Sequence, residues 1–203
     1  AVDGDGVILV ASWDDQRLSA ASRELLAAAA SLGEGLGVGV AFTSLGGAGG
    51  AAESGAHGAA QAYAFDGNLR ASGGEAALAA LTELVRELGA RVVLLTADER
   101  TAELAPRLAE RLGGAAVLSA TRVEARDGRA LVTKPVFGAK AVAELEAVAE
   151  PVVATLRRGA AEAREPTAAT APVSTRPAPA VDSAVELLAE EAPGAGSSLE
   201  DAK

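Results

Sequence analysis

Three short segments of the sequence carry residue types that could do chemistry. Asp14 and Asp15 form an acidic pair, Gly46 to Gly50 is a glycine-rich run, and His57 is the single histidine of the chain. Glycine runs allow a backbone to approach phosphates, carboxylates hold hard cations, and histidine moves protons near neutral pH. The sequence around each segment decides between these chemistries and a structural role.

The glycine-rich run contains Gly47-x-Gly49-x-x-Ala52, which is similar to a dinucleotide-binding fingerprint, and Asp66 ends the next expected strand. Such a fingerprint normally opens the first strand–helix unit and leads directly into a strong helix. Here the run follows the second expected strand and precedes a weak, alanine-rich helix toward Gln61. A glycine-rich loop is therefore favoured over a phosphate site.

The histidine and the acidic pair are also interpreted as structural. His57 follows Ser54 by three residues, but no acidic residue is placed to fix its tautomer, so we expect a solvated histidine in a mobile surface loop. Asp14 and Asp15 follow the first strand, where open α/β sheets bind ligands. They lack partners at metal-binding spacing, so a hydrated loop is favoured. We expect no catalytic residue and no metal site.

Two further segments contain basic residues that could bind a ligand or a partner. Arg107 and Arg111 lie one turn apart on an expected helix, with Glu103 and Glu110 in reach for ion pairs, which favours a structural role. The stretch Val136 to Lys140 combines apolar, aromatic, glycine and basic residues. It can meet either a cofactor or a partner chain, and its sequence alone does not decide between them.

Composition excludes several classes of function. The chain has no cysteine, which excludes disulfides, thiolate nucleophiles and cysteine-based metal sites. A net charge of −10 repels nucleic acid and anionic membrane surfaces, and the few aromatic residues give little material for base stacking. No apolar run is long enough to span a bilayer, and the acidic start is unlike a signal peptide. We expect a cytoplasmic protein whose partners are proteins or small ligands.

Short apolar runs alternate along the chain with stripes of helical spacing. The expected strands are Val7–Ala11, Val38–Phe42, Ala62–Phe65 and Arg91–Leu95. The expected helices are one from Ser19 to Gly33, one from Leu78 to Gly89 and one through Leu104 to Gly113. This alternation predicts a Rossmann-like open parallel sheet with helices on both faces.

An antiparallel extension is expected after the alternating part. Arg122–Arg126 and Arg129–Thr133 flank Asp127-Gly128, which favours a two-residue hairpin turn. Val136–Leu145 and Pro151–Leu156 are expected to add two more strands to this extension. The sequence thus predicts an α/β domain over residues 1–159.

Residues 160–203 are expected to form an Ala/Pro-rich linker and tail. Four prolines fall between residues 160 and 180, a composition that resists packing. Val181, Val185 and Leu188 have the spacing of one or two helical turns after Asp182, too short to be stable alone.

The order of these segments resembles the α subunit of electron-transfer flavoproteins. The segments that carry the resemblance are Ile8–Ala11, Leu18–Ala21, Glu24–Ala29, Thr96–Ala97, Leu104–Gly113, Lys134–Ala141, Pro151–Arg157 and Ser198–Lys203. Two positions depart from the family pattern: Ser12-Trp13 stands where the family usually has an acidic residue, and Ala139 replaces a second glycine. The segment Gly46 to Gln61 departs most.

The resemblance implies an electron carrier rather than an enzyme. Such an α subunit pairs with a β subunit, and the heterodimer uses FAD to carry electrons from acyl-CoA dehydrogenases of fatty acid β-oxidation, and from other dehydrogenases, to a membrane quinone oxidoreductase. The resemblance further implies that the flavin domain begins where this chain stops, with AMP possible in the β subunit. We therefore assign no FAD-binding residue to this chain, and expect it to be scaffold whose partner interface includes Lys134, Phe137 and Lys140.

Two other interpretations stay open. A free-standing adenine-nucleotide-binding domain predicts AMP or ATP near Asp14 and the Gly46 to Gly50 loop, whereas the flavoprotein interpretation predicts an empty sheet edge. A structural partner protein that keeps the fold without a flavin domain is the third possibility.

Overall fold

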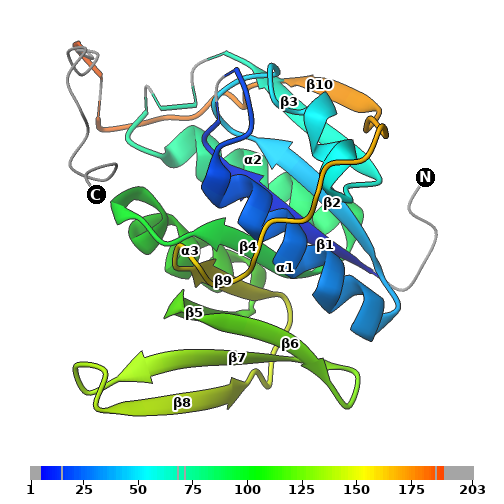
Figure 1. Ribbon diagram of the computed structural model, residues 1–203. Coiled ribbons are helices and arrows are strands. Elements are labelled where there is room, and N and C mark those ends of the chain that lie inside the picture. Colours follow the sequence, from blue (N-terminus) through cyan, green and yellow to red (C-terminus); the bar gives the residue numbers. More distant parts are fainter. Residues whose placement is uncertain (1–5, 15, 68, 71, 186, 190–203) are drawn as a thin grey trace, which may run out of the picture.

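The computed structural model describes residues 6–14, 16–67, 69–70, 72–185 and 187–189. These residues form a seven-stranded parallel sheet in the order β10-β3-β2-β1-β4-β9-β5 and a three-stranded antiparallel sheet in the order β6-β7-β8 (Figure 1). The strands of the large sheet are β1 (Val7–Ser12), β2 (Gly39–Ser44), β3 (Gln61–Asp66), β4 (Ala90–Thr96), β5 (Ala115–Ala120), β9 (Val152–Leu156) and β10 (Val173–Pro177). The small sheet contains β6 (Arg122–Arg126), β7 (Arg129–Val136) and β8 (Ala141–Glu146).

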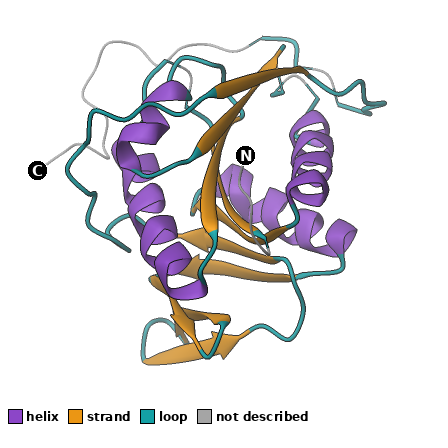
Figure 2. Ribbon diagram, turned by 90° about the vertical axis from the view of Figure 1, so that its right-hand side faces the viewer, coloured by secondary structure: helices purple, strands orange, loops and turns teal. Residues whose placement is uncertain are grey.

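Helices cover both faces of the large sheet, as Figure 2 shows. Helix α1 (Ala20–Leu36) packs on one face, while α2 (Glu75–Leu88) and α3 (Glu99–Leu112) pack on the other. Along β1, Ile8 and Val10 belong to the core under α1, and Val7 and Leu9 belong to the core under α2 and α3. A central parallel strand buries both faces, so its residues form a continuous apolar run. The predicted α/β class and two-faced packing are confirmed.

The helix ends follow from local chemistry. Ser19 caps α1 by accepting a hydrogen bond from the Ser22 backbone nitrogen at 3.1 Å, as predicted. The helix does not end at Gly33 but at Gly37, whose φ of 70° is the left-handed conformation that glycine adopts easily. Gly33 is needed for another reason: a Cβ there would lie 2.7 Å from the Val38 carbonyl oxygen.

The predicted hairpin between β6 and β7 is present. Asp127 and Gly128 both have positive φ angles, 52° and 76°, as a two-residue turn of this hand requires. The expected strand Val136–Leu145 is divided by a turn at residues 137–140, so that β7 ends at Val136 and β8 begins at Ala141.

Strand β9 lies in the parallel sheet and not in the antiparallel extension, where it was predicted. Pro151–Leu156 was expected to extend the antiparallel part, but β9 inserts between β4 and β5 in the parallel sheet. All five residues of β9 are buried, which is typical of a central parallel strand. The small antiparallel sheet therefore takes the place of a helix in the connection from β5 to β9.

The first part of the expected linker packs on the domain. Residues 160–178, which we call the strap, run over α1 and add β10 beside β3 (Figure 1). Arg164 pairs with Glu34 of α1 at 2.8 Å, and Ala171 is buried against Gly55. The composition was misleading because this strap needs only an edge strand and a few anchors. No helix forms over Val181–Leu188 in the described residues.

Candidate functional site

A cleft of about 730 Å³ opens where β1, β4 and β9 end. Its lining includes the last residues of these strands, Ser12, Thr96 and Leu156, together with Trp13 after β1 and Arg158 after β9. From β1 the chain adds β2 and β3 on one side of the sheet, and it then adds β4 on the other side. The boundary between β1 and β4 is therefore the topological switch point. In open α/β sheets, ligands bind in the crevice outside the carboxyl ends of the strands at such a point.

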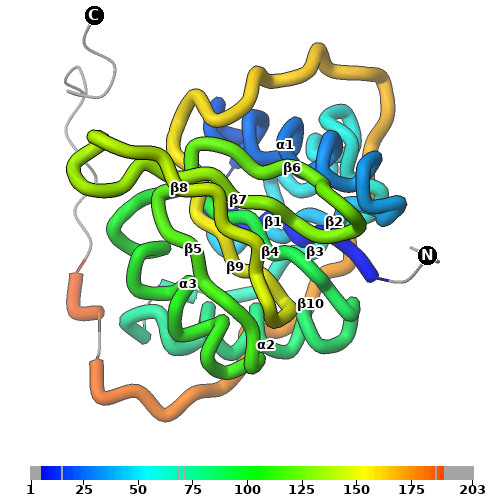
Figure 3. Tube along the Cα trace, turned by 90° about the horizontal axis from the view of Figure 1, so that it is seen from below, coloured from blue at the N-terminus to red at the C-terminus, as the bar shows by residue number. Residues whose placement is uncertain are grey.

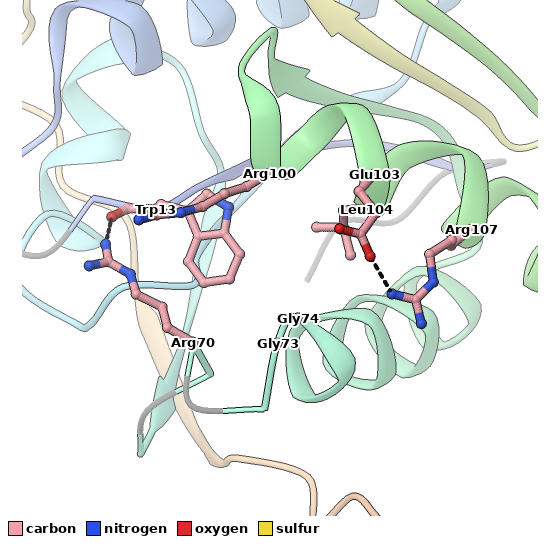
Figure 4. A pocket seen from close by; sticks show the side chains of 8 residues that line it. All are labelled: Trp13, Arg70, Gly73, Gly74, Arg100, Glu103, Leu104 and Arg107. Carbon is pink, nitrogen blue, oxygen red and sulfur yellow. Dashed lines mark hydrogen bonds and ion pairs between the residues drawn. The ribbon is translucent and has the colours of Figure 1, made fainter. Parts of the chain in front are cut away.

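A smaller cavity of about 190 Å³ adjoins this cleft, and we call it the Trp13 cavity (Figure 4). It lies between the N-terminal part of α2 and one side of α3, and it shares three lining residues with the cleft: Trp13, Arg70 and Arg100. The Arg70 and Arg100 guanidinium carbons lie 5.7 and 5.9 Å from the centroid of the indole ring. These distances allow a cation–π contact from each arginine.

The walls of the Trp13 cavity are held by hydrogen bonds and ion pairs. Arg70 donates to the Trp13 carbonyl oxygen at 3.0 Å, which fixes the loop after β1. Arg107 pairs with Glu103 on its own helix at 3.2 Å and with Glu75 of α2. Those contacts of Arg107 hold its pKa above the ordinary value, with the hydrogen bond to Glu75 as the largest cause.

The acidic residue of the first loop has a structural role. The carboxylate of Asp14 accepts a hydrogen bond from the Ser12 hydroxyl at 3.0 Å, and its carbonyl oxygen accepts one from the Ser44 hydroxyl at 2.6 Å. Asp15 lies outside the described residues. Among the residues that the structure describes, no group of acidic residues and histidine is arranged to hold a metal ion.

The glycine-rich run does not form a phosphate loop. It leads into a 3₁₀ helix, Ala52–His57, rather than into an α-helix, so it lacks the helix that a fingerprint requires. Gly50 instead packs against the chain before α1, because a Cβ there would lie 3.0 Å from the backbone carbon of Arg17. The run lines neither the cleft nor the Trp13 cavity. The interpretation as a glycine-rich loop fits this structure.

The prediction that His57 is solvated is wrong. The residue is only 5% exposed. The strap is joined to the same 3₁₀ helix by the hydrogen bond from the Thr167 nitrogen to the Ala56 carbonyl oxygen at 3.0 Å. The Ser54 hydroxyl donates to the Ala51 carbonyl oxygen at 2.6 Å and is thus engaged with the backbone. This geometry provides no serine–histidine pair for catalysis.

The predicted interface residues lie at one end of the small antiparallel sheet. Phe137 is 82% exposed in the turn between β7 and β8, Lys140 is exposed in the same turn, and Lys134 is half-buried on β7. Val142 and Val148 are also exposed, at 67% and 96%. Figure 3 shows β7 and β8 on the underside of the molecule, and no residue of these two strands lines the cleft.

The Trp13 cavity was not predicted from the sequence. Its residues come from the first loop, from the loop before α2 and from α3, and no spacing rule connects these segments. One signal was available, since the single tryptophan of the chain directly follows the first strand, where ligands bind in this class of sheet. Its neighbours Arg70 and Arg100 needed the folded structure.

Comparison with known proteins gives two matches. A family model described as "Electron transfer flavoprotein domain" matches residues 7–181. A curated protein named "Electron transfer flavoprotein subunit alpha", from Syntrophomonas wolfei subsp. wolfei (strain DSM 2245B / Goettingen), is 28% identical over 107 residues. That alignment covers 52% of this chain and 34% of the relative, so the chain matches about a third of the relative's length. In the described part of the chain, no helix is long and apolar enough to cross a membrane.

Proposed function

This chain belongs to the electron transfer flavoprotein domain family, and we propose that it is the scaffold domain of an α subunit. In this proposal the chain pairs with a β subunit, and the heterodimer carries electrons from dehydrogenases, such as acyl-CoA dehydrogenases, to a quinone oxidoreductase through FAD. The chain itself is an electron-carrier component of the cytoplasm and no catalyst. Support comes from the family match and from the resemblance of its segments to the α subunit.

One observation carries the proposed pairing with a β subunit: large apolar side chains are exposed on β8 and in the segments at its two ends. Phe137, Val142 and Val148 present large apolar side chains to solvent, and β8 is an edge strand with unpaired backbone groups. Exposed strand edges recruit further chains unless they are blocked or covered, and aromatic residues often anchor protein interfaces. The β subunit is the partner that this family provides.

Two loops of this chain lack the features with which a dinucleotide such as FAD is usually held. The first strand–helix loop, where a pyrophosphate is normally bound, contains no glycine between Ser12 and Ser19. Without glycine the backbone cannot approach the phosphates closely. The glycine-rich run after β2 lacks the α-helix. We therefore derive no electron-transfer step from this chain, and FAD in the heterodimer is proposed to be bound by other residues.

A binding experiment with a β subunit of the family tests this proposal. Sedimentation of this chain with the β subunit is expected to show a one-to-one complex at micromolar concentration. Charge reversal at the exposed Lys140 is expected to slow association and to change its salt dependence, because rim charges act mainly on the association rate. An unaltered chain that sediments independently of every β subunit tested would refute the proposal.

A further inference from the structure

The Trp13 cavity has the features of a binding site, and none of them is used by the proposed pairing with a β subunit. We propose that it binds a small organic anion, in which a carboxylate or phosphate group is attached to an apolar body of one ring or a short branched chain.

The charge of the lining favours an anion. Arg70, Arg100 and Arg107 line the cavity together with a single acidic residue, Glu103, although the whole chain carries a net charge of −10. Arg107 is engaged with Glu103 and Glu75. Arg100 contacts the Trp13 ring and has no carboxylate partner among the described residues. It is the cation most available to an incoming anion.

The remaining lining favours an apolar body attached to that anion. The indole ring of Trp13 and the side chain of Leu104 face the same space (Figure 4). Gly73 and Gly74 contribute only backbone to the lining, and the side chain of Val185 lies against Gly73. The volume of about 190 Å³ is comparable with the roughly 150 Å³ of an apolar cavity that holds benzene. A flat ring can stack on the indole while its anionic group meets Arg100.

The position in the fold agrees with this proposal. The Trp13 cavity opens beside the cleft at the switch point, where the carboxyl ends of the parallel strands leave room for ligands. It differs from the nucleotide position considered from the sequence, because the Gly46 to Gly50 loop takes no part in its lining. The volume of the cavity, about 190 Å³, limits it to a ligand smaller than a dinucleotide.

Trp13 is the only tryptophan, so its fluorescence reports the site directly. Phenyl phosphate and phenylacetate are titrated as probes against the isolated chain, with benzyl alcohol as the neutral control, and equilibrium dialysis repeats each measurement. At least one anion is expected to bind saturably and about tenfold or more tightly than benzyl alcohol, since a charged hydrogen bond contributes that much. The tighter anion identifies the head group.

Two variants separate the site from general charge effects. Arg100→Gln is expected to weaken anion binding about tenfold or more, whereas Lys140→Gln removes the same charge from a turn that lines neither the cavity nor the cleft and is expected to leave anion binding unchanged. Arg100 is exposed, so its replacement is expected to keep the melting temperature. The proposal is overturned if neither anion binds saturably, if benzyl alcohol binds equally well, or if the two variants behave alike. None of these outcomes depends on a β subunit.

Discussion

Arg176 of β10 and Glu87 of α2 form a two-point ion pair: Nη1 lies 2.5 Å from Oε2, and Nη2 lies 2.7 Å from Oε1. The Arg176 guanidinium also lies 4.8 Å from the centroid of the Tyr63 ring. The hydrogen bond from Arg176 holds the pKa of the Glu87 carboxyl below its ordinary value. The pair fastens the strap to a helix that is 89 positions earlier in the chain.

The pair is expected to make stability depend on pH. Because the pKa of Glu87 is lowered in the folded state, its contribution is complete above the ordinary carboxyl pKa and is lost as pH falls through the lowered value. Glu87→Gln should therefore reduce the free energy of unfolding at neutral pH by less than about 1 kcal/mol, since the pair is partly exposed. In acid the difference should vanish. Thermal melts at several pH values measure the stability difference between Glu87→Gln and the unaltered chain. Glu110→Gln is the control, and the same pH-dependent difference in that variant would contradict the prediction.

The strap is expected to protect its trypsin site at Arg164. Arg164 and Arg176 are held by ion pairs, and a Cβ at Gly55 would lie 2.1 Å from the Ala171 nitrogen. Gly55→Ala should therefore displace the strap and speed tryptic cleavage after Arg164; the bond after Arg176 resists trypsin in any state because Pro177 follows it. Limited proteolysis followed by mass spectrometry checks this, with cleavage at Lys140 as the internal reference. Rapid cleavage after Arg164 in the unaltered chain would show instead a linker that does not pack.

The sequence was sufficient for most of the fold because its local signals agree. The glycines at 89 and 113 end α2 and α3 as predicted, and Asp127-Gly128 forms the predicted hairpin turn. The prediction of the fold failed where a segment packs against residues that are distant in the sequence. β9 is an apolar run whose parallel partners β4 and β5 no local pattern could identify, and β10 is a polar edge strand within a proline-rich segment.

The turn between β7 and β8 contains a residue that strains the backbone. Ala139 has a φ of 64°, in the left-handed region that costs a residue with a Cβ about 1 kcal/mol. Ala139→Gly should therefore raise the free energy of unfolding by up to about 1 kcal/mol, less the entropy that glycine adds to the unfolded chain. Chemical denaturation measures the change. Ala143→Gly in β8, where the backbone is extended, is the control and should destabilise by about 0.5–1 kcal/mol.

The isolated chain is expected to bind no FAD tightly, because neither the loop after β1 nor the glycine-rich run can approach a pyrophosphate. The chain is incubated with excess FAD and desalted, and its flavin absorbance is then measured. Near-stoichiometric flavin retained after desalting would show that the described residues do form a cradle. Free riboflavin serves as the control for unspecific retention.

The site residues were less predictable than the fold. Phe137 could be proposed as an interface residue from the sequence because it is an aromatic residue beside a glycine, and the structure places it exposed in a turn. The environment of His57 was not predicted because its 3₁₀ helix is held by the strap, a segment more than a hundred positions away, as the Thr167–Ala56 contact shows. The Trp13 cavity is likewise made by three segments that only the folded sheet brings together.

The central claim is that this domain meets a β subunit through its small antiparallel sheet. Phe137 is 82% exposed, so Phe137→Ala removes apolar contact area without opening the core. The variant is expected to melt like the unaltered chain. Val185→Ala shortens an exposed apolar side chain on the tail and serves as the matched control.

The most direct measurement is the dissociation constant of this chain with the β subunit, determined for the unaltered chain and for both variants. We predict that Phe137→Ala raises the constant about tenfold or more, as expected for a central aromatic anchor, while Val185→Ala leaves it unchanged. No measurable complex with the unaltered chain, or a Phe137→Ala variant that binds as tightly as the control, would contradict the account.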